Sequence, residues 1–224
     1  MSQTVAFSSL KGGVGKTTCT IFFAESLRAA GKRILLVDLD PQHSLTTYYQ
    51  ALGLELRGDS DVLTYLRSWR TPLQKVIVGS NGISLLPSNI KLTEFAKNPP
   101  SGQRLKRMTR KLSKLKTLEE YDYILIDTSP TISALSLLSL PVTQILLLIT
   151  TPEIWSVRAV NLYLESLQSN AEAVGSNLRD VSVVTNAFDK SRASDRRVLE
   201  AMKETIPDYV AKTPIPFSKS VRNY

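Results

Sequence analysis

The chain has 224 residues, of which 42% are hydrophobic, and a formal net charge of +8 at pH 7. This length is enough for one domain with a substantial buried core. The single cysteine and single histidine exclude a disulfide framework and a Cys/His metal cluster within one chain, so we expect a reducing compartment and oxygen ligands for any metal. The positive charge favours an anionic partner, without distinguishing nucleic acid from acidic lipid.

The chain begins with MSQTVAF, which lacks a basic segment followed by a long apolar run. We therefore expect a cytoplasmic protein. The first predicted elements are a strand at residues 5–7 and a helix that begins near Lys16 and ends before Gly31. Between them lies SSLKGGVGKTT, residues 8–18. A strand, a glycine-rich loop and a helix are the context that a phosphate-binding loop requires.

The loop departs from the usual pattern at one position. The usual pattern is Gly, any four residues, and then Gly-Lys-Ser/Thr. In this chain the pattern would need a glycine at residue 10, but that residue is Leu10, and Lys11 follows it. Glycines let backbone amides approach phosphate oxygens, Lys16 would neutralise the terminal phosphates, and the Thr17 hydroxyl would bind Mg²⁺. The predicted phosphate cradle is the backbone of Gly12, Gly13, Val14 and Gly15.

Acidic residues follow two later apolar strands. A strand at residues 34–37 leads into Asp38, with Asp40 two residues later, and a strand at residues 123–126 leads into Asp127. Phosphoryl transfer needs carboxylates at the ends of neighbouring strands, to hold the metal and to orient the attacking water. Together with the loop, these residues predict a site for a nucleotide and Mg²⁺.

The segment between these two strands has less regular patterns. Residues 58–69 predict a short helix, and residues 76–88 predict a hairpin or a strand with a turn at Asn81-Gly82. Residues 103–116, QRLKRMTRKLSKLK, predict an amphipathic helix docked on the sheet, with an apolar stripe and a basic outer face. Whether that basic face contacts DNA or is only solvated stays open.

Residues 128–152 carry no charge and are long enough to suggest a membrane span. Pro130, Pro141 and several polar residues interrupt the segment, so we expect a short buried helix followed by a strand at residues 145–149. A last strand is expected at residues 181–184. Apolar runs separated by helix-length segments predict one α/β domain over residues 1–224, with a mostly parallel twisted sheet and helices on both faces, as in P-loop NTPases.

Three motifs carry a specific resemblance. KGGVGKTT, with a lysine at its start, VDLDPQ at 37–42 and ILIDTSP at 124–130 resemble the deviant Walker A ATPases, most closely the ParA/Soj family of partition ATPases in the SIMIBI/MinD superfamily. The weaker motifs are ITTPE at 149–153 and TPIPFSKSV at 213–221. In that family the extra lysine, here Lys11, reaches the nucleotide of the other subunit, which implies an ATP-dependent homodimer with weak basal turnover.

The same resemblance implies roles for individual residues. The catalytic residues would be Lys11, Lys16 and Asp40, and Asp40 would position the attacking water. The Mg²⁺ ligands would be Thr17, Asp38 and Asp127, and Thr18 would contact the α-phosphate of ATP. Asn186 and Pro216 are the predicted adenine contacts.

The sequence departs from the family pattern in two places. Ser129 stands where a proline is more usual, and we expect little effect from that change. The chain stops at Tyr224, where relatives usually continue into a final helix, so it is either a short member or a truncated native chain.

The resemblance also implies nonspecific DNA contacts in the C-terminal part of the chain. The predicted residues are Arg192, Arg197, Lys219 and Arg222. Basic side chains without a groove-reading motif suit phosphate contacts, which give affinity but no choice of sequence. No helix-turn-helix pattern precedes the phosphate loop, so operator-specific repression is not expected.

The leading hypothesis is a nucleoid-associated, cytoplasmic ATPase that positions or segregates a plasmid, a chromosome or another cargo. A ParB-like or other adaptor protein would stimulate hydrolysis and release it from DNA. The alternative is a MinD-like ATPase on a membrane surface, but residues 213–224 are short and broken by prolines, so no stable membrane insertion is expected. A nitrogenase-reductase-like protein or metal carrier would need cysteines besides Cys19, and Lys11 with Asp40 disfavours a scaffold without turnover.

Overall fold

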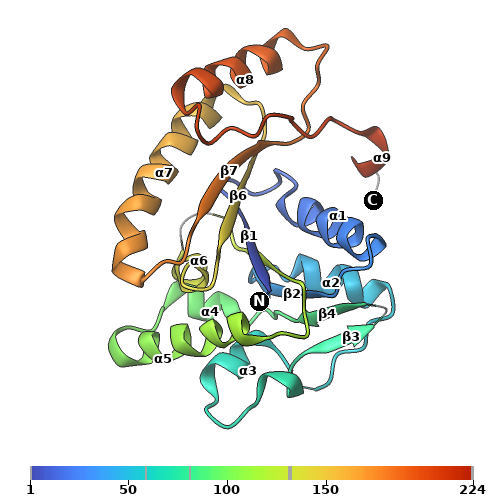
Figure 1. Cartoon of the computed structure of the whole chain (residues 1–224), viewed down its shortest axis with the longest axis vertical. Helices are drawn as coiled ribbons and strands as arrows, with labels where there is room; N and C mark the ends of the chain where they lie inside the picture. Colours follow the sequence, from blue (N-terminus) through green and yellow to red (C-terminus); the bar gives the residue numbers. More distant parts are fainter. Residues whose placement is uncertain (1, 59, 81, 131–132, 223–224) are drawn as a thin grey trace.

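The computed structural model describes residues 2–58, 60–80, 82–130 and 133–222 (Figure 1). Within them lies a seven-stranded sheet in the order β3-β4-β2-β5-β1-β6-β7. Every neighbouring pair of strands is parallel except β3 with β4. The strands are β1 (Gln3–Ser9), β2 (Ile34–Leu39), β3 (Val78–Ser80), β4 (Ile83–Leu86), β5 (Tyr123–Thr128), β6 (Ile145–Thr150) and β7 (Asp180–Thr185).

Helices cover both faces of the sheet. On one face, α1 (Lys16–Ala29) and α2 (Ser44–Ala51) pack against the odd residues of β1, such as Phe7. On the other face, Ala6 belongs to a larger apolar core that joins α3 (Val62–Arg67), α4 (Leu92–Lys97), α5 (Gly102–Leu112), α6 (Ala134–Ser139) and α7 (Ile154–Val174). Side chains of alternate strand residues point to opposite faces, and each face therefore needs its own apolar cover.

The chain ends at the β7 side of the sheet. Helix α8 (Ala193–Thr205) packs on α7, and α9 (Lys219–Arg222) is a single turn near the last described residue. Two 3₁₀ turns, η1 (Leu73–Lys75) and η2 (Ser113–Thr117), complete the described elements. Figure 1 shows the segment after α8 running back along β7 toward the start of α1.

The predicted α/β fold is confirmed, with all five predicted strands and the first helix in place. The uncharged segment at 128–152 holds the buried α6 and β6, as expected. Within the described residues, no helix has both the length and the apolar character needed to cross a membrane. The predicted hairpin is the antiparallel pair β3–β4, although Asn81 of its turn lies outside the described residues.

One boundary was wrong. The basic helix does not run to residue 116, because α5 ends at Leu112 and the 3₁₀ turn η2 follows. The tighter winding still buries Leu115, so the apolar stripe continues across the change of helix type.

The register of the central strands positions the site. Asp127 at the end of β5 pairs with Phe7 of β1 and with Asp38 of β2. Because parallel strands end at the same edge of a sheet, the loop after β1 and the two aspartates meet there, as the sequence predicts.

Candidate nucleotide site

The loop between β1 and α1 has the backbone of a phosphate cradle. Gly13 and Gly15 have positive φ angles of 79° and 84°, a region that favours glycine. A Cβ atom at Gly15 would lie 2.4 Å from the side-chain nitrogen Nδ2 of Asn186, whereas one at Gly12 or Gly13 would meet no atom within 4 Å. The loop is therefore packed on one side and open on the other, where phosphate oxygens can approach its amides.

Lys16 and Thr17 begin α1 and converge on one carboxylate. The Lys16 ammonium, with a side chain only 5% exposed, lies 2.5 Å from Oδ1 of Asp127 and 3.6 Å from Oδ2 of Asp40. The Thr17 hydroxyl donates a 2.7 Å hydrogen bond to the other oxygen of Asp127. Four residues that the sequence assigned to phosphate and Mg²⁺ chemistry are thus held within one group of ion pairs and hydrogen bonds.

Asp38 is fully buried behind this group. Its carboxylate accepts hydrogen bonds from the Thr46 amide at 3.0 Å, the Thr46 hydroxyl at 2.7 Å and the Asp40 amide at 3.0 Å. Burial, followed by the negative charge of Asp127, raises the pKa of Asp38 to about 7. Thr46 was not predicted, because nothing in its sequence context distinguishes it from any other threonine in the first turn of a helix.

Asp127 is also fully buried, and burial raises the pKa of its carboxyl group against the opposing effect of Lys16. Three carboxylates, those of Asp38, Asp40 and Asp127, are buried near one ammonium, and this excess of negative charge favours the binding of a further cation. Among the described residues, no three His, Cys, Asp or Glu side chains cluster as a metal cage. The Asp38 and Asp127 carboxylates and the Thr17 hydroxyl are oxygen donors, and Mg²⁺ is usually bound by one or two carboxylates with waters and substrate phosphates. The residues present therefore fit a Mg²⁺–nucleotide complex.

Asp40 is held at the same edge by its own loop. One carboxylate oxygen accepts a 2.9 Å hydrogen bond from the Gln42 amide, and the Ser88 hydroxyl donates to the Asp40 carbonyl at 2.8 Å. The second oxygen faces the Lys16 ammonium. A fixed carboxylate at this place suits the orientation of a water molecule, the role assigned to Asp40 from the sequence.

Lys11 does not join this buried group. Its ammonium bonds both oxygens of Glu153, at 2.9 and 3.1 Å, and its side chain is 64% exposed. The Thr151 hydroxyl also donates to Glu153, at 3.0 Å. Hydrogen bonding from Lys11, followed by that from Thr151, holds the pKa of Glu153 below its usual value. The lysine that the sequence assigned to a neighbouring subunit therefore lies at the surface of its own chain.

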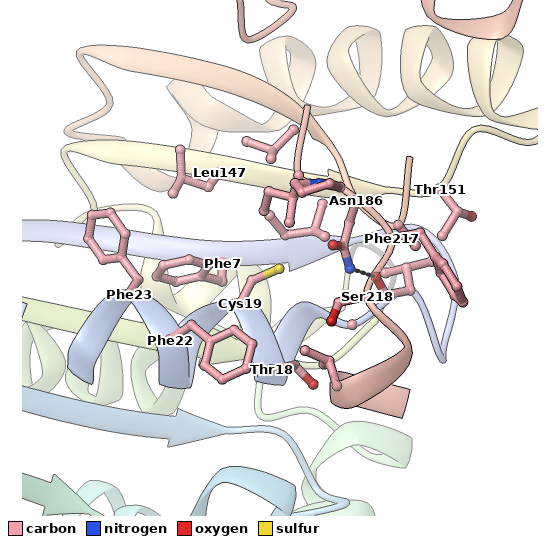
Figure 2. A pocket seen from close by; sticks show the side chains of 18 of the residues that line it. Phe7, Thr18, Cys19, Phe22, Phe23, Leu147, Thr151, Asn186, Phe217 and Ser218 are labelled. Atoms are coloured by element: carbon pink, nitrogen blue, oxygen red, sulfur yellow. Dashed lines mark hydrogen bonds between the residues drawn. The ribbon is translucent and has the colours of Figure 1, made fainter. Parts of the chain in front are cut away.

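A cavity of about 680 Å³ opens beside the loop. Figure 2 shows Asn186, Thr18 and Phe217 at the end near the loop, and Phe7, Phe23 and Leu147 at the apolar end. The side-chain amide of Asn186 donates a 2.7 Å hydrogen bond to the Val14 carbonyl. Pro216 also lines the cavity, so both residues predicted to contact the adenine line the cavity that opens beside the loop.

Backbone pairing holds the Pro216 segment in place. The Phe188 amide donates to the Ile215 carbonyl at 3.0 Å, and the Phe217 amide donates to the Phe188 carbonyl at 2.9 Å. A C-terminal segment distant in sequence thereby forms one wall of the cavity.

The AAA_31 family model, described as an AAA domain, matches residues 2–179. The chain belongs to this family. Among curated proteins, the sporulation initiation inhibitor protein Soj of Bacillus subtilis is 28% identical over 227 residues, which cover 96% of this chain and 85% of that protein. The virulence plasmid ParA family protein pGP5-D of Chlamydia psittaci is 28% identical, over 91% of this chain and 76% of that protein. The ParA/Soj resemblance and the ATPase class predicted from the sequence are confirmed.

Solved structures support the same assignment. A cobyrinic acid a,c-diamide synthase from Mycobacterium smegmatis with bound ADP and magnesium has a TM-score of 0.80 and 27% identity, over 98% of this chain and 88% of that chain. A plasmid partition protein from Borrelia burgdorferi has a TM-score of 0.79 at 23% identity, over 98% and 91%, and supports the fold alone. The ligands of the first structure are of the kind predicted for this ATPase.

The predicted DNA contacts belong to two helices, α8 and α9, and α9 borders the nucleotide cavity of the ATPase through Val221. Arg192 and Arg197 are exposed at the start of α8, and Lys219 is exposed in α9. The Arg192 guanidinium lies 3.4 Å from the Asp189 carboxylate, which offsets part of its charge. The backbone of Arg222 belongs to α9, but its side chain lies outside the described part of the chain.

Proposed function

We propose that this ATPase forms an ATP-dependent sandwich homodimer, binds DNA nonspecifically in that state, and positions or segregates a cargo. Adaptor-stimulated hydrolysis then releases it from DNA. The observation that carries this proposal is the separation of Lys11 from the buried group of Lys16, Thr17, Asp40 and Asp127. The chain holds nearly all of a hydrolytic site, and one further lysine is presented outward.

The buried group would act on ATP with Mg²⁺. Amides of the glycine-rich loop and the Lys16 ammonium would bind the phosphates, and Thr17, Asp38 and Asp127 would hold the metal. Bound Mg²⁺ neutralises charge that develops on the phosphate oxygens. Asp40 would orient the attacking water, since its carboxylate is fixed beside Lys16. The cavity lined by Asn186 and Pro216 would take the adenine.

Lys11 would complete the site of a second copy. A positive group that reaches the nucleotide only when two chains meet makes hydrolysis depend on assembly, as an arginine finger does. The isolated chain should therefore turn over slowly. The ion pair to Glu153 keeps Lys11 on the surface of its own chain until that meeting.

Relatives support a positioning role. Besides Soj and the plasmid ParA family protein, a cell division protein, PomZ of Myxococcus xanthus, is 29% identical over 93% of this chain and 65% of that protein. We propose nonspecific DNA contacts through Arg192, Arg197, Lys219 and Arg222, a ParB-like or other stimulating adaptor, and a nucleoid-associated location in the cytoplasm.

The test is binding to a duplex of random sequence with ADP, with ATP, and with ATP plus Lys11→Ala, over a series of salt concentrations. We expect binding that needs ATP, is lost in the variant and weakens as salt rises. Equal binding in all three states would contradict nucleotide gating. Absence of DNA binding together with ATP-dependent binding to anionic vesicles would favour the MinD-like alternative.

A further inference from the structure

Helix α5 presents a basic surface that the nucleotide site does not use. Between Gly102 and Leu118 the chain has no acidic residue. Met108, Leu112 and Leu115 are buried in the core, which turns the intervening cations outward. We call the exposed basic residues of α5 and η2 the α5 basic face, which consists of Arg104, Lys106, Arg107, Arg110 and Lys114.

The charges of the α5 basic face are not compensated. None of its residues forms an ion pair with a carboxylate among the described residues, whereas Arg28, Arg33 and Arg192 each have an acidic partner. A row of unpaired cations on one flank of a protein creates a local positive potential that attracts polyanions. In the C-terminal cluster, acidic residues such as Asp189 and Glu200 lie among the basic ones.

An exposed aromatic residue adjoins this row. Trp69, which is 66% exposed, lies beneath the Arg107 guanidinium, whose central carbon is 5.4 Å from the ring centroid. The Lys111 ammonium donates to the carbonyls of Ser68 and Thr71, and so fixes the Trp69 segment to α5. A cation stacked on an aromatic ring and a tethered loop lose less conformational freedom when a ligand binds.

The shape of the surface favours a long, regular polyanion. The hollow between Trp69 and α5 holds about 210 Å³, smaller than the range of roughly 300–1,000 Å³ in which small-molecule sites usually fall. Lys106 and Arg110 are four residues apart on α5, a rise of about 6 Å along an α-helix, and Lys114 continues the row in η2. Duplex DNA carries one negative charge per about 1.7 Å of its axis, so such a row meets phosphates in any sequence register.

We propose that the α5 basic face, together with Trp69, binds the phosphate backbone of duplex DNA. This inference rests on the proposed function and adds a surface distinct from the C-terminal residues. Through η2, α5 leads into the start of β5, the end of that strand opposite Asp127 (Figure 1). The α5 basic face therefore stays accessible when a second copy covers the edge of the sheet that holds the nucleotide site. In an ATP-bound dimer, the two copies of the face would bind one duplex at the same time. The dimer would then bind DNA more tightly than a single chain does.

The first measurement compares two variants that lose equal charge, in fluorescence anisotropy with a labelled random duplex, ATP and a salt series. Arg110→Gln/Lys114→Gln removes two members of the face. Lys32→Gln/Arg57→Gln removes two exposed charges from loops elsewhere. We expect the first variant to reduce the slope of log affinity against log salt by about four per dimer, or two for each chain, and the second to leave it unchanged. Thermal unfolding of both variants checks that they fold.

The second measurement reports on the face directly. The chain has two tryptophans, so Trp155→Phe leaves Trp69 as the sole emitter. We expect Trp69 emission to change as the duplex is added in the presence of ATP.

The outcomes separate this inference from the proposed function. One outcome is tight ATP-dependent DNA binding with equal salt slopes in both double variants and constant Trp69 emission. This would contradict DNA binding by the α5 basic face and leave the proposed function standing. No DNA binding by the unmodified protein in ATP would overturn both. A Trp69 response to phosphatidylglycerol vesicles but not to DNA would assign the face to a membrane and would also overturn the inference.

Discussion

The nucleotide edge, which is the edge of the sheet where β1, β2 and β5 end, and the α5 basic face both contain many charged side chains. The charges are buried at the first and exposed to solvent at the second. At the nucleotide edge, Lys16 and the carboxylates of Asp38 and Asp127 are buried and hydrogen-bonded to one another or to nearby donors. On the α5 basic face the cations are exposed and unpaired. A buried charge needs partners at fixed distances, since desolvation is costly, whereas a solvated charge costs little and acts through its field. Chemistry that needs fixed geometry lies at the first region, and binding without sequence choice suits the second.

Removal of the buried ammonium should have the largest effect. Lys16→Ala leaves Asp127 without its cation, and removal of one partner of a buried pair costs on the order of 3–5 kcal/mol of unfolding free energy. The carboxyl groups then bind protons more readily in the folded state than in the unfolded state, so the loss should be greater at pH 8 than at pH 6. Urea unfolding at both pH values measures it, and ATP hydrolysis should be abolished.

The matched control for this prediction is Lys32→Ala, since Lys32 is exposed. A surface substitution of this kind should change stability by no more than about 0.5 kcal/mol. Equal stability of the two variants would mean that Lys16 does not compensate the buried carboxylates.

Replacement of Asp40, which we propose orients the attacking water, should affect turnover alone. Asp40→Asn keeps the shape of the side chain and an oxygen that can accept the Gln42 amide. Loss of a positioned base or water-orienting group typically lowers the rate by about 10²–10⁴-fold. Phosphate release in a single turnover should fall by that amount, while binding of a fluorescent ATP analogue stays within a factor of two or so of the unmodified protein. An unchanged rate would remove Asp40 from the mechanism.

Cys19 reports on the same edge without taking part in the chemistry. Burial, followed by the negative charge of Asp127, raises the pKa of its thiol to about 11. The reactive thiolate is then a fraction of about 10⁻³ at pH 8, so alkylation should be roughly a hundredfold slower than in the urea-unfolded chain. Iodoacetamide labelling followed by mass spectrometry gives the rate, which should keep rising up to about pH 11. Equal rates in the folded and unfolded chain would show that the thiol is not shielded.

The smallest effect is expected at the exposed ion pair. Glu153→Gln releases Lys11, and an exposed pair contributes at most about 1 kcal/mol. Stability should barely change, but each dimer contains two such pairs, so the ATP-dependent dimer should form at up to about 30-fold lower protein concentration. Light scattering over a dilution series measures this, with Glu55→Gln, another exposed glutamate, as the control. A dimer that forms at the same or a higher concentration would show that Glu153 does not restrain Lys11.

The sequence by itself determined the strand–loop–helix context, the glycine-rich loop that leads into Lys16 and Thr17, and the carboxylates that follow β2 and β5. These features were predictable because each depends on local spacing: a glycine where the loop needs a positive φ angle, an apolar run for a buried strand, and an aspartate at its end. The parallel register then brings Asp38 beside Asp127 with no further information. Lys11 was also identified from its place in the loop.

Only the tertiary structure decided how these residues are held. Thr46 bonds Asp38 across 8 positions and Lys11 bonds Glu153 across 142, whereas Asn186 bonds the loop across 172. The change of α5 to a 3₁₀ turn, and the Trp69 loop fixed by Lys111, likewise depend on neighbouring helices. Such contacts leave no periodicity or motif in the sequence, because the chain must fold before their partners become neighbours.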